Sequence, residues 1–179
     1  ELLSQVLEQK LAAKSAAEAA RAAEIARHVR EAITHTRSLA RGLFPVELEA
    51  NGLMSALQEL AAGVEKMFKV ECRFQCEDSV LLSDHAVATH VYRIAQEAIN
   101  NAIKHGKAGS ILISLKPADG NLNLTVMDDG KGFPEEFKPA KGMGLRIMNY
   151  RTGMIGGSLD IRQASGKGTI VTCSFKNDP

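Results

Sequence analysis

The chain has 179 residues, of which 45% are hydrophobic and 24% charged, a composition ordinary for a soluble globular domain or for one domain with an appendage. A formal net charge of +1 gives no reason to expect nucleic acid or an anionic membrane as the main partner. No apolar run approaches the roughly 18 residues that a membrane-spanning helix needs. The N-terminus shows no leader pattern. Because the chain lacks a starting Met, we expect it to be a piece of a longer protein.

Residues 1–45 are predicted to form a helical hairpin. Leu3, Leu7 and Leu11 give one helix an apolar stripe, and a connection is expected near Ser15. The second helix has apolar or small residues at spacings that alternate between three and four, as in a heptad seam: Ala19, Ala22, Ala26, Val29, Ile33, Thr36, Ala40 and Leu43. This alanine-rich seam is too narrow for two helices alone, so we expect a homodimer that completes a four-helix bundle.

Gly42 and Pro45 mark the end of that helix, and the domain boundary is expected near residue 46. Residues 46–179 predict an α+β domain with helices on one face of a mixed or antiparallel sheet. In chain order, the patterns indicate a helix over 52–68, a strand within 69–78, a long helix from the N-cap candidates Ser83 and Asp84 to His105, a hairpin over 110–130 with its turn at Asp119–Gly120, a helix over 144–156, and a hairpin over 157–176 with its turn at Ser165–Gly168. Gly106 is expected to stop the long helix.

The three cysteines, Cys72, Cys76 and Cys173, form no metal-ligand spacing. Cys72 and Cys76 have an even spacing that would place both on one face of a strand. We expect buried, reduced thiols, because free Cys packs as a small apolar residue, with a redox switch as the alternative. Reduced thiols favour a cytoplasmic compartment.

The long helix carries an unusual polar stretch, "QEAINNAIKHG" (Gln96–Gly106). Glu97 and Asn101 are four residues apart, so they project from the same side of the helix, and Lys104 and His105 follow on roughly that side. Asn has a poor helix propensity, so the adjacent pair Asn100 and Asn101 in mid-helix suggests a functional site.

Three glycine-rich stretches follow in the order "DDGKGF", "GMGL" and "GKGT". Glycine lets backbone N–H groups approach an anion closely because it has no Cβ. None of the stretches is a standard phosphate loop: Ile161 stands where a Walker A pattern before "GKGT" would need its first glycine, and no dinucleotide fingerprint is complete. Each stretch alone is more typical of a turn.

In combination, "QEAINNAIKH", "DDGKGF", "GMGL" and "GKGT" resemble the N box and the three glycine boxes of the ATP-binding domain shared by histidine kinases, gyrase-type topoisomerases, Hsp90-type chaperones and MutL-type repair proteins. The resemblance covers about Leu53 to Phe175 and implies a two-layer α/β sandwich of the GHKL (Bergerat) type. The stretch "REAITHTRSLARGLFPVELEANGLMSALQELA" resembles the second dimerisation helix and linker of one class of bacterial sensor histidine kinases, whose partners are usually response regulators with helix-turn-helix output domains.

The resemblance implies roles for the polar helix. Glu97 matches the carboxylate that acts on the attacking group as a general base or positions it. Asn101 matches the Mg²⁺ ligand, since an amide oxygen suits a hard cation that is also bound by phosphates. Lys104 and His105 are placed to meet phosphate oxygens, with helix capping as the alternative for His105. Asn100 is not the matching position, and solvent exposure or a helix-end contact is expected for it.

The glycine boxes imply the adenine side of the site. Asp128 matches the acceptor of a hydrogen bond from the adenine amino group. Asp129 shares the strand end, although the spacing to Gly130 and Gly132 favours Asp128. Thr169 matches the residue that supports the contact between adenine and Asp128.

The segment "GFPEEFKPAKGMG" resembles a lid over the triphosphate. Gly142 and Gly144 would let it fold over the phosphates, and the N-terminus of the helix that begins near Leu145 would face them.

The phosphoacceptor histidine of the family has no clear match. His28 and His35 fall at heptad position c, facing solvent, and are followed by Val29 and Thr36 instead of an acidic residue. We therefore expect the acceptor to lie upstream of Glu1.

The resemblance implies a histidine kinase core that binds ATP and Mg²⁺, phosphorylates a histidine, and passes the phosphoryl group to a response regulator receiver domain. The alternatives are an anti-sigma-type serine kinase, which the long heptad helix argues against, and a non-catalytic docking module that binds ATP and dimerises.

Overall fold

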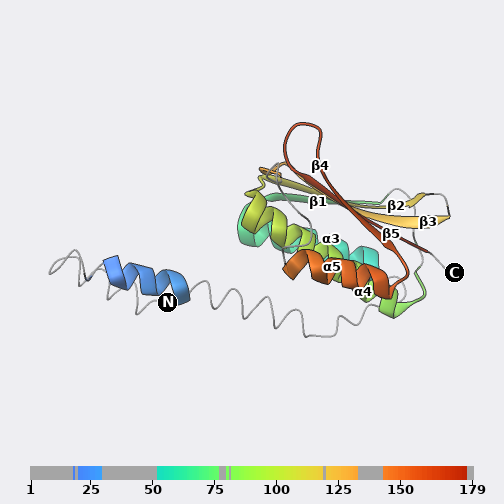
Figure 1. Cartoon of the computed structure of the whole chain (residues 1–179), viewed down its shortest axis with the longest axis horizontal. Coiled ribbons are helices and arrows are strands. Elements are labelled where there is room, and N and C mark those ends of the chain that lie inside the picture. The colour runs from blue at the N-terminus through green and yellow to red at the C-terminus, as the bar shows by residue number, and fades with distance from the viewer. Residues whose placement is uncertain are drawn as a thin grey trace. The chain divides into compact units, whose positions relative to one another are not determined.

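The computed structural model describes residues 18, 20–29, 52–76, 80, 82–118, 120–132 and 143–176. The chain divides into two compact units, 1–45 and 46–179 (Figure 1), and each is described by itself. That the first unit is a dimerisation hairpin and the second a catalytic domain stays a prediction. Leu3, Leu7, Leu11 and His35 lie outside the described residues.

In the first unit, residues 20–29 form an α-helix. Ala22 and Ala26, two of the predicted seam positions, are buried, whereas Val29 is 39% exposed. Outside the seam, Ile25 is 61% exposed. The helix thus buries its small seam residues and leaves larger apolar side chains at the surface.

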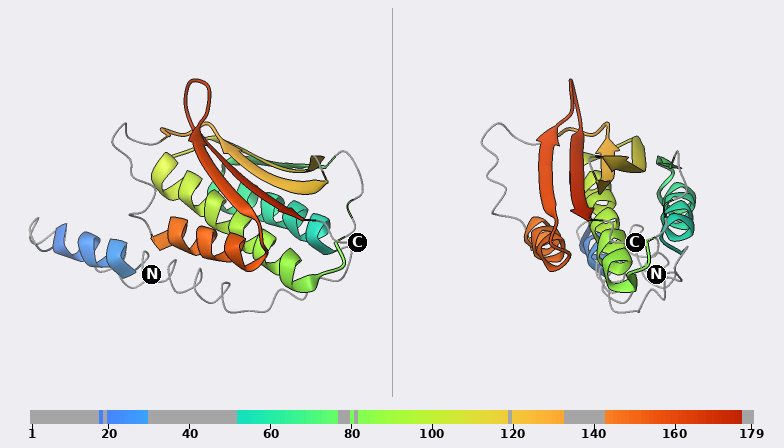
Figure 2. Two further views of the ribbon diagram at one scale, coloured as in Figure 1. Left: turned by 45° about the vertical axis from the view of Figure 1, so that its right-hand side comes forward. Right: turned by 90° about the vertical axis from the view of Figure 1, so that its right-hand side faces the viewer.

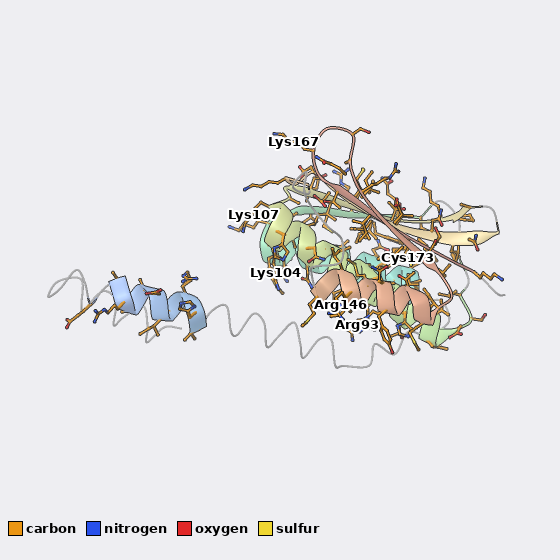
Figure 3. All side chains as sticks on the ribbon, viewed as in Figure 1. Arg93, Lys104, Lys107, Arg146, Lys167 and Cys173 are labelled. Carbon is orange, nitrogen blue, oxygen red and sulfur yellow. The ribbon has the colours of Figure 1, made fainter. Side chains whose placement is uncertain are left out.

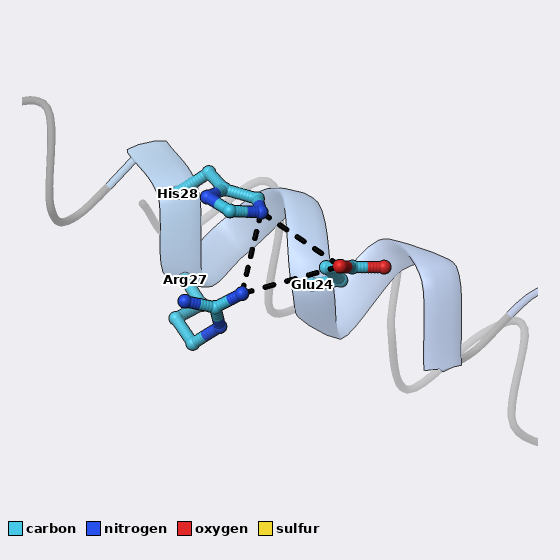
Figure 4. A network of polar contacts seen from close by, with 3 residues as sticks. All are labelled: Glu24, Arg27 and His28. Atoms are coloured by element: carbon cyan, nitrogen blue, oxygen red, sulfur yellow. Dashed lines mark hydrogen bonds and ion pairs between the residues drawn. The ribbon is translucent and has the colours of Figure 1, made fainter.

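His28 lies on the exposed side of this helix, as heptad position c predicts. Its Nε2 is 3.8 Å from Glu24 Oε1 and 3.3 Å from an Arg27 guanidinium nitrogen (Figure 4). The pair with Glu24 has the i, i+4 spacing of surface helix pairs, which contribute little to stability.

The second unit is built on a five-stranded sheet with the strand order β1-β2-β3-β5-β4. Its strands are β1 (Glu71–Gln75), β2 (Ser110–Ala118), β3 (Asn121–Asp128), β4 (Ser158–Gln163) and β5 (Thr169–Lys176). β1 runs parallel to β2, and the other neighbours pair antiparallel. This confirms the predicted mixed sheet and α+β class.

Three helices lie together on one face of this sheet, so the unit has two layers (Figures 1 and 2). They are α3 (Gly52–Phe68), α4 (His85–Asn101) and α5 (Met143–Met154). The central helix, α4, contacts both α3 and α5 as well as β3 and β5. None of the described helices is both long and apolar enough to cross a membrane.

The core forms between the sheet and α4 because every second strand residue points toward the helices. In β2, β3 and β5, nine apolar residues are buried there: Ile111, Ile113, Leu115, Leu122, Leu124, Val126, Val171, Cys173 and Phe175. From α4 they meet Val91, Ile94, Ala95 and Ala98. The alternate positions on the other sheet face are largely polar, so a single apolar layer holds the unit together.

The start of α4 agrees with one of the two predicted caps. Asp84 has extended backbone dihedrals, and its carboxylate accepts hydrogen bonds from the N–H groups of Ala86 and Val87, at 2.7 and 3.2 Å. These are two of the four N–H groups that a helix start leaves without an intrahelical partner. Asp84 is therefore the N-cap.

The end of α4 differs from the prediction of one helix running to His105 and stopped by Gly106. At Ala102 the helix changes to a π-helical turn, Ala102–Gly106, and the left-handed residue beyond it is Lys107, with φ 55°. Gly106 itself has no positive φ. Its carbonyl oxygen instead lies against Gly130, where an added Cβ would approach it to 2.6 Å.

The cysteine prediction is partly wrong. Cys76 lies just beyond the end of β1 and continues the alternation of burial that begins at Cys72, but it is only half-buried. Cys72 and Cys173 are buried, and none of the three cysteines, all of which the structure describes, forms a disulfide. Burial raises the pKa of Cys72 to about 11, so its thiol stays protonated at neutral pH.

We expect Asp84→Ala to lower the free energy of unfolding by about 1 kcal/mol, because two N–H groups at the start of α4 lose their acceptor. Denaturant unfolding followed by circular dichroism measures the change. Asp84→Asn is the matched control, since Asn caps helices about as well as Asp. Equal losses in both variants would contradict the capping role.

Candidate functional site

The polar side of α4 meets the first turn of α5. A Cβ built on Gly144 would overlap Oε1 of Glu97 and would lie 3.4 Å from Nδ2 of Asn101. Glu97 and Asn101 are both half-buried, on the same side of α4 and one turn apart. The N-box and second glycine-box residues predicted from the sequence are therefore brought together, and Gly144 permits this close approach.

Within the described part of the chain, no such close contact is seen for the other residues predicted near the phosphates, namely Lys104, His105 and Leu145. Lys104 and His105 belong to the π-helical turn and are exposed. Lys104 and Lys107 lie toward the same end of the unit as Lys167 of the β4–β5 connection (Figure 3). Leu145 is only 7% exposed and packs in the core, so only its backbone is left to face a ligand.

Asp128, the last residue of β3, is a buried carboxylate with 8% exposure. Its Oδ1 accepts a hydrogen bond from the N–H of Gly130 at 2.8 Å. Thr169 donates to it through both its backbone N–H and its side-chain hydroxyl. Burial raises the pKa of Asp128, whereas these hydrogen bonds oppose the rise. The predicted pair of Asp128 and Thr169 is thus in direct contact.

Three glycines crowd around Asp128 from three segments. A Cβ on Gly130 would lie 2.6 Å from the carbonyl oxygen of Gly106, and one on Gly168 would overlap the carbonyl oxygen of Asp128. A Cβ on Gly106 would lie 3.4 Å from Oδ1 of Asp128. The Lys131 N–H also donates to the Gly106 carbonyl at 2.8 Å. The end of the π-helical turn is thereby fixed against the end of β3.

Gly132 and Gly168 both have positive φ, at 71° and 95°. A Cβ on Gly132 would lie 3.1 Å from the carbonyl oxygen of Gly168 and 3.2 Å from Nε2 of Gln163. Both positions therefore need glycine for conformation and for space. The first and third glycine boxes meet at this point. Gly142 and residues 133–141 lie outside the described residues, so the predicted lid is untested.

Asp129 points to the other side of the strand end and is exposed. Its Oδ1 accepts hydrogen bonds from the N–H groups of Gly109 and Ser110, at 2.8 and 2.9 Å. These bonds, led by that from Ser110, hold the pKa of Asp129 below its usual range. Of the two adjacent carboxylates, Asp128 faces the glycine-lined region and Asp129 binds the start of β2.

Two contacts were not predicted from the sequence: that of Gly106 with Gly130, and that of Asp129 with the start of β2. Gly106 was expected only as a helix stop, and Asp129 only as an alternative to Asp128. A signal for Asp129 did exist: with Leu124, Val126 and Asp128 on the buried side of β3, period-two alternation places Asp129 outside. The contact between Gly106 and Gly130 had no such signal, because it joins segments far apart in the chain.

The family model described as "Histidine kinase-, DNA gyrase B-, and HSP90-like ATPase" matches residues 86–179. The chain belongs to this ATPase family. The matched range contains the polar end of α4, both carboxylates and the glycines around them.

Within this ATPase family the chain is similar to sensor proteins, including two sensor histidine kinases. It is 34% identical to the sensor histidine kinase LiaS of Bacillus subtilis over 79% of this chain and 39% of that protein. It is 34% identical to the nitrate/nitrite sensor protein NarQ of Escherichia coli over 75% of this chain and 24% of that protein. It is 32% identical to the oxygen sensor histidine kinase NreB of Staphylococcus carnosus over 78% of this chain and 41% of that protein. The chain thus spans well under half the length of these relatives.

Solved structures agree on the fold. The histidine kinase domain of a blue-light-activated histidine kinase from Erythrobacter litoralis matches with a TM-score of 0.61 and 23% identity, over 74% of this chain and 65% of that chain. The ATP binding domain of PrrB from Mycobacterium tuberculosis matches with a TM-score of 0.58 and 16% identity, over 71% of this chain and 95% of that chain. The second unit therefore has the histidine kinase ATP-binding fold that the resemblance implied.

We expect Gly130→Ala to lower the free energy of unfolding by about 1–3 kcal/mol, because the added Cβ would press on the Gly106 carbonyl and force the backbone apart. Chemical denaturation measures the loss. Gly63→Ala in α3 is the matched control: nothing lies within 4 Å of its added Cβ. In a helix this control should gain about 0.5–1 kcal/mol. Equal behaviour of the two variants would refute the close contact.

Asp128 gives a prediction with a defined pH dependence. Its folded-state pKa is raised, mainly by burial, so ionisation costs the folded state stability as the pH rises from the ordinary aspartate pKa through the raised one. Asp128→Asn cannot ionise. We expect its stability relative to wild type to increase through this window and to level off above it, in denaturant unfolding at a series of pH values. A difference that does not vary with pH would contradict the burial of the charge.

Proposed function

We propose that this chain contains the ATP-binding catalytic core of a sensor histidine kinase, which transfers the γ-phosphoryl group of ATP to a histidine. The observation that carries the proposal is that two clusters of polar side chains form in the second unit. In one, Glu97 and Asn101 lie against Gly144. In the other, the buried Asp128 bonds to Thr169 between glycines. The names of the similar proteins, two of them sensor histidine kinases, support it.

Asp128 is the proposed acceptor for the amino group of adenine. A buried carboxylate held by Gly130 and Thr169 is fixed in direction, so it would favour a base that offers a donor at that position. Guanine has a carbonyl there and would face the carboxylate with a second acceptor. The site should therefore prefer ATP to GTP.

Asn101 is the proposed Mg²⁺ ligand. A neutral amide oxygen at a half-exposed position fits an ion that keeps several waters and is held mainly by phosphate oxygens. When bound, the ion would neutralise charge on the phosphates. The start of α5, beside Asn101 through Gly144, would present backbone N–H groups to the same phosphates, and Lys104 and His105 would reach them from the π-helical turn.

Glu97 is the proposed base. When an imidazole nitrogen of the acceptor attacks the γ-phosphorus, the bond from phosphorus to the bridging oxygen of ADP breaks. The Glu97 carboxylate would accept or hold the proton of the other imidazole nitrogen, which makes the ring a better nucleophile. We expect the acceptor to be a histidine other than His28 or His35.

The phosphohistidine would then pass its phosphoryl group to an aspartate of a response regulator receiver domain. We further propose that the kinase is a homodimer held by the N-terminal helices. Exposed Ile25 and Val29 on helix 20–29 support this, because apolar side chains at heptad-type spacing are typical of helices that pack against a partner.

ATP binding tests the proposal first. With Mg²⁺ present, calorimetry should show ATP binding to the full chain, and Asn101→Ala should weaken it on the order of tenfold, about 1.4 kcal/mol. In EDTA the two proteins should bind ATP alike, because the substituted group acts through the metal. Asn123→Ala, in the middle of β3, is the matched control and should bind as wild type does. Loss of the same size with and without Mg²⁺ would contradict a metal-ligand role for Asn101.

Phosphoryl transfer tests the assignment of the base. We expect Glu97→Gln to bind Mg-ATP within about threefold of wild type, but to transfer phosphate to an added acceptor-helix protein more slowly by a factor of about 10²–10⁴. Radiolabelled ATP in single-turnover reactions measures the rate. If wild type binds ATP but transfers nothing to the acceptor helices of related kinases, the chain is a docking module and the kinase proposal fails.

A further inference from the structure

Asp129 lies beside the proposed adenine acceptor, yet its carboxylate is directed to a different part of the chain. Oδ1 accepts the N–H groups of Gly109 and Ser110, at 2.8 and 2.9 Å, and the Asp129 N–H donates to the Ser110 carbonyl at 3.2 Å. One residue thus makes three hydrogen bonds to Ser110, which begins β2, and to Gly109 just before it. A carboxylate engaged in this way is committed to the protein backbone.

The position of these bonds in the sheet explains what they hold. Ile111 and Asp128 are the last residues paired in the β2–β3 ladder. Beyond that pair, Asp129 continues the connection by one further residue, through its backbone and through its side chain. The side chain thus adds two hydrogen bonds to the single backbone bond that holds the strand end to β2 beyond Asp128.

The start of β2 is itself tied to the end of α4. The N–H groups of Lys107 and Ala108 both donate to the carbonyl of Ala102, the residue that follows Asn101. The Gly109 carbonyl accepts the N–H of Glu71 from β1 at 3.0 Å. The short connector from Ala102 to Ser110 is therefore fixed at both ends, and Asp129 is the side chain that closes it onto β3.

We propose that Asp129 is a positioning residue, which holds the carboxylate of Asp128 at the place where the amino group of adenine is read. This inference rests on the proposed function, because it concerns the same nucleotide site. Asp129 itself touches no nucleotide. It acts by fixing the strand end to the start of β2, so that Asp128 cannot shift relative to the base.

A positioning role for Asp129 predicts a change in nucleotide preference, which a general loss of stability would not produce. If Asp129 serves the contact to the amino group, its loss should affect ATP and spare purine riboside triphosphate, which has the same sugar and phosphates but lacks that group. Wild type should prefer ATP by on the order of tenfold, the value of one hydrogen bond to a charged group. In Asp129→Ala the preference should fall toward equal affinity, chiefly through weaker ATP binding.

The experiment is calorimetry of both nucleotides with Mg²⁺, on the full chain of 179 residues, for wild type and Asp129→Ala. Asp160→Ala is the matched control, because Asp160 in β4 is also an exposed aspartate, but its partner is Arg162, at 3.8 Å. The control should keep the wild-type preference for ATP. Hydrogen exchange of the Gly109 and Ser110 amides, measured by NMR, should quicken in Asp129→Ala and not in Asp160→Ala.

Asp129→Asn covers the case in which the alanine variant does not fold. Its amide oxygen can still accept both N–H groups but without charge, so the preference for ATP should fall by a smaller factor. An unchanged preference in the folded Asp129 variants would overturn the inference and leave the proposed function standing. Equal loss of both nucleotides would also overturn it, since Asp129 would then support the whole site. A wild-type chain that binds neither nucleotide would refute the proposed function, and this inference with it.

Discussion

The site depends on one close backbone contact, that between Gly106 and Gly130. Because Gly130 has no Cβ, the end of the π-helical turn and the end of β3 come together, and the N–H of Lys131 donates to the Gly106 carbonyl. This contact sets how far the polar side of α4 lies from the buried carboxylate of Asp128. The functions proposed for Glu97 and Asn101 on α4 and for Asp128 on β3 all depend on this distance between them.

The π-helical turn is part of the same constraint. An α-helix that continued through Ala102–Gly106 would present Gly106 at a different angle, because a π turn spans one more residue per hydrogen bond. Lys107, at φ 55°, then takes the left-handed conformation that turns the chain into β2. The strain of a left-handed lysine is a small cost, roughly 1 kcal/mol, that the bonds around it offset. Such π turns are frequent at functional sites, and the polar residues on this one agree with that tendency.

Burial and hydrogen bonding give the adjacent aspartates opposite properties. Asp128 is desolvated, so its pKa is raised, whereas Asp129 is exposed and bonded to backbone N–H groups, so its pKa is lowered. We propose that one of these two chemically identical side chains serves recognition and the other serves structure. The apolar layer between the sheet and the helices holds β3 in place. The residues at the end of β3 lie beyond this layer and can therefore be polar.

Much of the fold could be predicted from the sequence because it follows from local patterns. The helix over 52–68, the turn before Asn121 and the cap at Asp84 each rest on residues that are near neighbours in the chain. The ATP-binding family could be inferred from the order in which the glycine boxes follow the N box. The contacts of Gly106 and the partners of Asp129 could not be predicted in this way, since both join distant segments and depend on the π-helical turn. The buried side chain of Leu145 is a similar case: helix periodicity alone does not say which face meets the core.

The most direct test of the central claim is a map of backbone amide shifts by two-dimensional NMR as Mg-ATP is added, with Mg-GTP as the comparison. If one site spans the end of α4 and the end of β3, the amides of Gly106, Gly130, Gly144 and Gly168 should shift together with ATP and respond weakly to GTP. Shifts confined to α3 or the open face of the sheet, or identical responses to both nucleotides, would contradict it.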